Sequence, residues 1–226
     1  MRLGVLFSGG KDSCFACWKA MEKEEVLCLI SVHPGNPESH LYHTPNIGLT
    51  VLQAEAAGLP LVTVESDGVE EEEVADLSRA MSRGVEEHGI EGVVTGAIRS
   101  VYQATRIQRV CHDLDLWCFN PLWQRDGEEH LEEVLASGFR FPVSGVSAAP
   151  LDERWLGREV DRQALEELKE LGRRVRMKPA GEGGEYETFD LDAPFFRKRI
   201  EVLVASREWS GDRGIFRIEE AGLVAK

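Results

Sequence analysis

The hexapeptide Ser8-Gly9-Gly10-Lys11-Asp12-Ser13 constrains this chain more than any other segment. It follows the apolar run 3–7 and precedes a helix-like segment that begins near Cys14, so a strand, a glycine turn and a helix come in that order. Two adjacent glycines let the backbone fold tightly around an anion, and the following helix directs its first N–H groups at that anion. The sequence therefore predicts a phosphate-binding loop.

The side chains of this loop suit a nucleotide. Lys11 can neutralise phosphate charge, Ser8 and Ser13 can donate hydrogen bonds, and Asp12 can hold Mg²⁺ or cap the helix. The common P-loop differs, because it requires glycine where this chain has Val5 and Ser or Thr where it has Asp12. The loop instead resembles the PP-loop of ATP pyrophosphatases, which implies ATP as cofactor and cleavage between its α- and β-phosphates.

Apolar runs alternate with helical patterns along the first half of the chain. Strands are predicted at 3–7, 26–33, 61–65, 92–97 and 116–120, and helices at 13–23, 46–57, 70–88 and 100–115. Thr44 and Pro45 are predicted to open the second helix. This alternation predicts a Rossmann-like α/β fold, a parallel sheet with helices on both faces. The phosphate loop then lies at the carboxyl edge of the sheet, where such folds bind ligands.

The pattern changes near Pro121. A helix is predicted at 128–136, an extended segment at 139–147, a helix at 161–171 and β-structure towards the end. We therefore predict a nucleotide-binding domain over residues 1–120 and a smaller α+β substrate-binding domain over residues 121–226.

The segment from Thr95 to Arg109 is the second candidate site region. Gly96, at the end of the fourth strand, would let a nucleotide approach the backbone, and His33, at the end of the second, would line the adenine pocket. Arg99 and Arg106 could bind a phosphate or a carboxylate. Salt bridges with nearby acids are the simpler explanation for both arginines and remain open.

The third region is Gly181-Glu182-Gly183-Gly184-Glu185-Tyr186-Glu187-Thr188. Alternating glycines and glutamates beside an aromatic ring suit a metal ion, an amine or a quaternary ammonium group. A solvated turn is the alternative.

Composition limits the function classes. The 26 Lys and Arg against 40 Asp and Glu give a formal net charge of −14, which disfavours a broad nucleic-acid-binding surface. The sequence has no apolar stretch of membrane-spanning length and no leader-like start, and its five cysteines do not resemble a secreted disulfide framework. We expect a cytoplasmic protein without membrane contact. A redox role for Cys14 and Cys17 stays open, as does a homo-oligomer.

Together these segments resemble one family. The SGGKDS loop, His43-Thr44-Pro45-Asn46, the 96–109 segment, Asn120-Pro121-Leu122-Trp123, Trp155-Leu156-Gly157-Arg158 and the 181–188 loop resemble the diphthine-ammonia ligase family in one order over nearly the whole chain. The resemblance implies that ATP activates the carboxylate of diphthine on translation elongation factor 2 as an acyl-adenylate, and that ammonium supplies the nitrogen as AMP leaves.

The resemblance also implies residue roles. Lys11, Asp12, Arg99, Arg106 and Glu185 would be catalytic, with Asp12 on Mg²⁺. Tyr102, Gln103, Glu182, Tyr186 and Glu187 would contact the substrate. Glu182, Glu185, Glu187 and Tyr186 would receive the trimethylammonium group of diphthine, or the three carboxylates would deprotonate ammonium. Two alternatives remain: another PP-loop enzyme, such as a tRNA thiolase with Cys14 as sulfur carrier or a small-metabolite amidotransferase, and a nucleotide sensor without turnover.

Overall fold

A computed structural model describes residues 1–34, 45–67 and 73–226 of the chain. His43 and Thr44 of the predicted segment 43–46 lie outside these ranges. Nine strands and six α-helices lie within them: β1 Arg2–Leu6, α1 Lys11–Met21, β2 Glu25–Pro34, α2 Thr50–Ala57, β3 Leu61–Ser66, α3 Glu73–His88, β4 Gly92–Val94, α4 Val101–Asp113, β5 Trp117–Phe119, α5 Gly127–Ala136, β6 Val143–Val146, α6 Arg162–Val175, β7 Tyr186–Thr188, β8 Lys198–Ser210 and β9 Arg213–Ala225.

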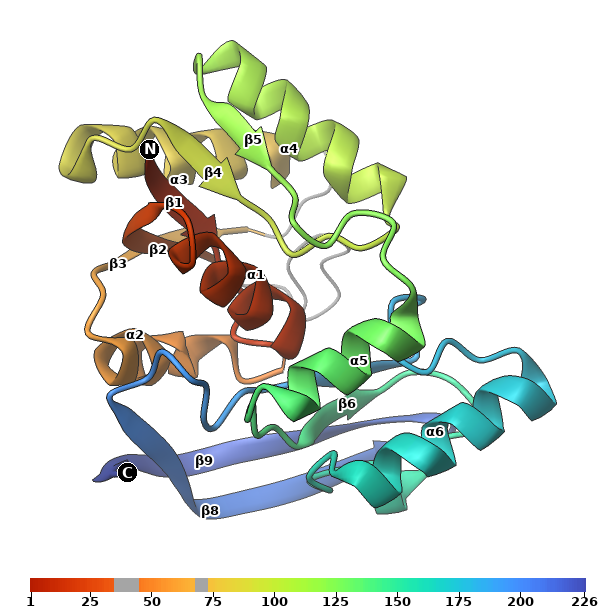
Figure 1. Ribbon diagram of the computed structural model, residues 1–226. Helices are drawn as coiled ribbons and strands as arrows, with labels where there is room; N and C mark the ends of the chain where they lie inside the picture. Colours follow the sequence, from red (N-terminus) through yellow and green to blue (C-terminus); the bar gives the residue numbers. More distant parts are fainter. Residues whose placement is uncertain (35–44, 68–72) are drawn as a thin grey trace.

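The first five strands form one parallel sheet in the order β3-β2-β1-β4-β5 (Figure 1). The chain runs outward from β1 through β2 to β3 and then returns to the other side of β1 as β4. The carboxyl ends of β1 and β4 therefore flank the point where the winding direction reverses, which is where doubly wound sheets bind ligands. The predicted Rossmann-like α/β fold is confirmed.

Helices cover both faces of this sheet, as its apolar strands require. On one face α3 and α4 pack against Cys28, Ile30 and Val93. On the other face α1 and α2 pack against Leu3, Val5 and Leu29. Neighbouring strand residues thus alternate between two cores, which is the period of two expected for a strand buried on both sides.

The second half of the chain builds a four-stranded antiparallel sheet in the order β7-β6-β9-β8, with α5 and α6 beside it (Figure 1). The predicted smaller C-terminal α+β region is confirmed. Phe141, Val143 and Leu156 of this region belong to the same core cluster as Leu3 and Val5. Because the apolar core is continuous, the two halves pack as neighbours, and the boundary at residue 121 stays a prediction.

The second predicted helix begins later than the sequence suggested. A 3₁₀ turn, Ile47–Leu49, precedes α2, and Asn46 before it adopts φ 67°. The Asn46 amide nitrogen donates to the carbonyl oxygen of Phe216 at 3.0 Å, and its amide oxygen accepts the N–H of Ile218 at 2.8 Å. Asn46 therefore ties the first half of the chain to β9.

The two hydrogen bonds and the positive φ of Asn46 predict different stabilities for two substitutions at this position. Asn46→Gly keeps the left-handed backbone conformation but loses both hydrogen bonds, which should lower the free energy of unfolding by about 1–3 kcal/mol. Asn46→Ala should cost about 1 kcal/mol more, because alanine is strained at positive φ. Urea denaturation measures both. Equal stabilities for the two variants would show that backbone conformation contributes nothing here.

Candidate functional site

The loop between β1 and α1 lines the wall of a cavity of about 590 Å³ at the carboxyl ends of β1 and β4. Ser8, Gly10, Lys11, Asp12 and Ser13 line this cavity, and their binding of a nucleotide stays a prediction. The Ser8 hydroxyl donates to Ser13 Oγ at 3.2 Å, and Ser13 Oγ donates to the carbonyl oxygen of Gly10 at 3.0 Å. The two hydroxyls thus bond within the loop and shape it.

Both glycines of the loop are required by their surroundings. Gly9 has φ +81°, and a Cβ built there would lie 2.3 Å from Gln53 Oε1. A Cβ on Gly10 would lie 3.0 Å from the carbonyl oxygen of Thr188. The loop therefore passes so close to two distant segments that only glycine fits.

The C-terminal half closes over this loop. The Lys11 N–H donates to Thr188 Oγ1 at 3.0 Å, so Thr188 caps a helix that begins 177 residues earlier. The Asp190 N–H donates to the carbonyl oxygen of Gly9 at 2.9 Å. Gln53 Nε2 donates to the same Gly9 oxygen and to the Asp190 carbonyl oxygen, both at 2.8 Å. The phosphate loop is thus built by both halves of the chain.

The charged centre of the cavity is a chain of three residues. Lys11, only 3% exposed, places Nζ 3.0 Å from Asp12 Oδ2, and His130 Nε2 lies 2.8 Å from Asp12 Oδ1. Burial alone would lower the pKa of Lys11, but the Asp12 carboxylate outweighs it and the pKa is raised. Burial opposes ionisation of Asp12, but Lys11 and the His130 hydrogen bond lower its pKa. The pair is therefore charged.

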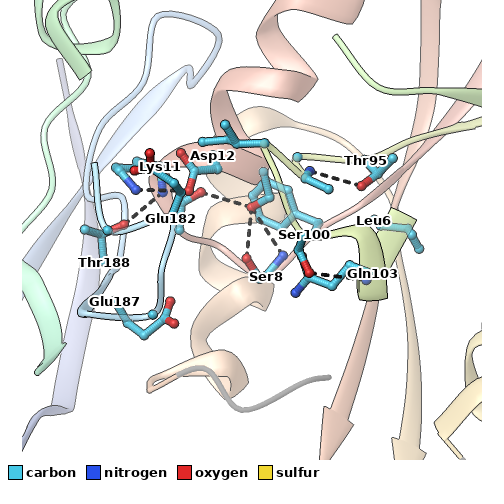
Figure 2. Close-up of a pocket in the computed structure, with 18 of the residues that line it drawn as sticks. Leu6, Ser8, Lys11, Asp12, Thr95, Ser100, Gln103, Glu182, Glu187 and Thr188 are labelled. Carbon is cyan, nitrogen blue, oxygen red and sulfur yellow. Dashed lines mark hydrogen bonds and ion pairs between the residues drawn. The ribbon is translucent and has the colours of Figure 1, made fainter. Parts of the chain in front are cut away.

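The acidic loop lies beside the phosphate loop in the same wall of the cavity. Glu182, Gly183, Gly184, Tyr186 and Glu187 line the cavity. In Figure 2 the labelled residues lie in two groups on either side of Ser8, with Lys11, Asp12, Glu182, Glu187 and Thr188 on one side and Thr95, Ser100 and Gln103 on the other. The cavity therefore joins the phosphate loop to the acidic loop.

The three glutamates of this loop differ in their surroundings. Burial, with Asp12 nearby, raises the pKa of Glu187 to about 7 against the opposing effect of Lys11. Glu182 Oε2 is buried and has no hydrogen-bond partner within the described residues. Glu185 instead accepts the N–H groups of Lys178 and Gly183, both at 2.9 Å, and is not among the cavity-lining residues. Its predicted catalytic role stays a prediction, while its contacts shape the loop.

Tyr186 is buried, and its hydroxyl donates to the Pro179 carbonyl oxygen at 2.7 Å. Lys11 Nζ lies 5.5 Å from the centroid of its ring, within cation–π distance. The ring is therefore already paired with a cation of the protein.

The segment after β4 supplies the other side of the cavity. Gly96, Arg99, Ser100 and Gln103 line it, and Ser100 caps α4 by accepting the Gln103 N–H at 3.3 Å. The structure adds a second reason for Gly96 to the predicted one: a Cβ there would lie 2.8 Å from the carbonyl carbon of Asp12 and 2.9 Å from the nitrogen of Ser13. The glycine lets α1 approach the β4 loop.

Besides Gly9 and Glu185, the predicted residues His33, Tyr102 and Arg106 are not among the residues that line the cavity. The Arg106 guanidinium stacks 3.3 Å from the centroid of the Tyr102 ring, so these two residues contact each other on α4. His33 Nε2 lies 3.3 Å from Thr50 Oγ1. The apolar side chains of Leu6, Ile30, Val32, Leu77 and Ile107 line the cavity instead, a wall that the sequence did not single out.

Sequence reasoning also missed His130, Thr188 and Gln53 as parts of the site. His130 lies among glutamates in a helix with no motif around it. Thr188 lies at the end of the predicted 181–188 segment, so its position near the site could have been inferred. Its bond to the first N–H of α1 is a long-range contact that no local sequence pattern encodes.

Known proteins resemble this chain throughout. Residues 1–117 match the family profile of the diphthamide synthase N-terminal domain, and residues 126–224 match that of its C-terminal domain. The chain belongs to the diphthine–ammonia ligase family. A protein of this name from Bos taurus is 36% identical over 222 residues, covering 89% of this chain and 83% of the relative, and the Homo sapiens protein gives the same values.

The Schizosaccharomyces pombe diphthine–ammonia ligase is also 36% identical, but this chain spans only 36% of its length. A solved structure described as a predicted subunit of a tRNA methyltransferase from Methanocaldococcus jannaschii aligns with a TM-score of 0.44 and 16% identity, covering 86% of this chain and 98% of that one; this similarity is too low to carry an argument. Membership of the ligase family makes the chain an enzyme of an ATP-using, PP-loop type. No helix among the described residues is long and apolar enough to cross a bilayer.

The close approach at Gly96 predicts a sharp effect of one methyl group. Gly96→Ala should lower the free energy of unfolding by about 1–3 kcal/mol, because backbone atoms of α1 must shift to admit the Cβ. It should also weaken ATP binding measured by calorimetry. Gly48→Ala is the matched control, because a Cβ there meets nothing within 4 Å. Equal stability of the two variants would contradict the packing argument.

The raised pKa of Glu187 predicts a pH-dependent stability. The unfolded chain releases this proton near the usual value of 4.5, whereas the folded protein keeps it to about 7, so the free energy of unfolding should fall as pH rises between these values. Glu187→Gln should remove this fall in the free energy of unfolding. The fall is at most about 3 kcal/mol, and solvent contact of the carboxyl makes it smaller. Denaturation at pH 5 and pH 8 measures it, with the exposed Glu201→Gln as control. An unchanged pH slope in Glu187→Gln would contradict the assignment.

Proposed function

We propose that this chain amidates diphthine on translation elongation factor 2, using ATP and ammonium, through an acyl-adenylate and with release of AMP and pyrophosphate. The observation that carries the proposal is the single cavity lined by both the phosphate loop and the acidic loop. Such a cavity can bind a polyanion at one end and a cation at the other. A carboxylate activated between them would meet its nitrogen donor without leaving the site.

The phosphate end supports pyrophosphate as the leaving group. Lys11 supplies a buried positive charge, and the N-terminus of α1 adds its dipole beside it. Both stabilise negative charge that develops on the departing phosphates. The apolar wall of Ile30, Val32 and Ile107 offers the adenine ring a dry surface at the same cavity.

Magnesium fits the donor set through Asp12. Each of its carboxylate oxygens already accepts one hydrogen bond, from Lys11 or His130, and retains a further lone pair. No group of three or more His, Cys, Asp or Glu side chains suited to a metal occurs among the described residues. This suits Mg²⁺, which proteins commonly hold by one or two carboxylates together with the phosphates of a nucleotide. The ion would neutralise phosphate charge there.

Arg99 is the cation best placed for the acyl group. It lines the cavity and is exposed, with Nη2 donating to the Arg125 carbonyl oxygen at 3.4 Å, a weak hydrogen bond that leaves most of its donors free to bind other groups. We propose that Arg99 orients the diphthine carboxylate against the α-phosphate. Gln103 lines the same wall and can donate to the substrate, whereas Arg106 and Tyr102, stacked on each other, would support α4.

The acidic end favours ammonium over the trimethylammonium group of diphthine. The buried Glu182 Oε2 has no hydrogen-bond donor in the part of the chain that the structure describes, and ammonium offers four N–H groups whereas a quaternary ammonium offers none. The Tyr186 ring, which could otherwise hold a methylated cation, already faces Lys11. We propose that Glu182 binds ammonium and that Glu187, with its pKa near 7, accepts the proton that converts it into nucleophilic ammonia.

The tRNA thiolase alternative requires a reactive thiolate. Cys14 and Cys17 are fully buried, and burial raises the pKa of both thiols. A thiolate is therefore disfavoured at both positions, which argues against a sulfur carrier.

The deciding experiment incubates diphthine-bearing elongation factor 2 with the protein, ATP, Mg²⁺ and ammonium. Mass spectrometry should record conversion of the acid to the amide while AMP accumulates. Lys11→Ala should slow this about 10²–10³-fold, because it removes a buried charge from the leaving group. Glu182→Gln should raise the KM for ammonium with little change in the KM for ATP.

Lys23→Ala, at an exposed lysine, is the control and should match the wild type. AMP release without amide formation would show that the protein turns over ATP but acts on a substrate other than diphthine. Absence of any ATP turnover would favour the nucleotide sensor.

A further inference from the structure

His130 is a fully buried polar side chain on α5 that no motif identified. Its Nε2 lies 2.8 Å from Asp12 Oδ1, and its ring packs edge-on to Phe15 with 5.3 Å between centroids. Residues 118 positions apart thus meet at the centre of the phosphate loop. Burying a polar histidine ring costs folding free energy unless the ring makes a hydrogen bond, and His130 makes one with Asp12.

The hydrogen-bond pattern fixes the tautomer of this ring. Asp12 is held ionised by Lys11 and His130, so its oxygens only accept and His130 Nε2 must carry the hydrogen. Nδ1 is buried without a partner within the described residues. A hydrogen on Nδ1 would be a buried donor with nothing to bond, whereas a bare lone pair costs less. The geometry therefore places a hydrogen on Nε2, directed at Asp12.

The two oxygens of Asp12 are divided between two elements. Oδ2 accepts from Lys11 Nζ, and Oδ1 accepts from His130. Tyr186, Glu187 and Asp190 also lie close enough to Asp12 to be influenced by its charge, and none of them supplies a second cation. When Lys11 turns towards a phosphate, His130 is the remaining donor that holds Asp12.

We propose that His130 is a positioning residue that keeps Asp12 in one orientation while Lys11 engages the nucleotide. The C-terminal half of the chain would in this way determine the geometry of the phosphate site in the N-terminal half. The proposal rests on the ATP-dependent reaction proposed above.

Two substitutions of His130 separate positioning from packing. In His130→Gln the side-chain amide reaches the place of Nε2 and can still donate to Asp12, whereas in His130→Asn the amide falls short. We expect His130→Asn to lower kcat for amide formation by about 10–100-fold with the KM for ATP changed less than about threefold, a size typical of residues that orient a catalytic ligand. His130→Gln should stay within about threefold of the wild type.

Val134→Ala, one turn further along α5, controls for damage to the helix. Val134 is fully buried and does not touch Asp12, so this variant should lower Tm and leave kcat intact. If Asn and Gln at position 130 behave alike, or if Val134→Ala loses as much kcat as His130→Asn, His130 only packs and the proposal fails.

A second measurement needs no turnover. Two-bond ¹H–¹⁵N spectra of the free protein, with the ring assigned by its loss in His130→Gln, should show a hydrogen on Nε2, and Asp12→Ala should remove the preference for that nitrogen. A wild-type ring whose Nε2 carries no hydrogen would overturn the proposal. If the wild-type protein forms neither amide nor AMP, the proposed function fails while this spectrum still decides the role of His130.

Discussion

The N-terminus of α1 is buried against a segment that the chain reaches only after Gly184. The Lys11 amide donates to Thr188 Oγ1, the Gly9 carbonyl oxygen accepts from Asp190, and a Cβ at Gly10 would collide with the Thr188 backbone. Unpaired N–H groups at a buried helix end are costly, so α1 and the 184–190 segment stabilise each other. The phosphate loop is therefore stabilised by contacts from both halves of the chain. These contacts also hold the two halves close enough to share one apolar core.

Burial of the helix end then dictates the charges around it. A buried lysine needs a partner, and Asp12 is the nearest carboxylate. With Asp12 ionised, further negative charge nearby is disfavoured, so burial raises the pKa of both Glu187 and Asp190. Because the raised pKa values of Glu187 and Asp190 limit the negative charge beside Lys11, the cavity can accept a polyanion there.

The sequence predicted what is encoded locally. The strand–glycine–helix order predicted the turn between β1 and α1, and the alternating pattern predicted the parallel sheet, because both depend on neighbouring residues. It could not predict His130, whose partner lies 118 residues away, nor the orientation of Glu185, which bonds amides of its own loop rather than facing the cavity. Nor could it predict that the backbone of α1 crowds Gly96, a second reason for glycine at this position. Residue type and spacing indicate chemistry, but packing decides which side chain faces the ligand.

The net charge of −14 does not conflict with binding of ATP. Exposed charges farther apart than about 8 Å are largely screened at physiological ionic strength, so most of the acidic surface has little effect on the cavity. Within the cavity, the buried Lys11 and the dipole of α1 act at short range and with little screening. A long polyanion such as RNA would instead lie across the acidic exterior, where no comparable cationic cleft was predicted. The same charge distribution therefore admits a nucleotide and discourages a nucleic acid.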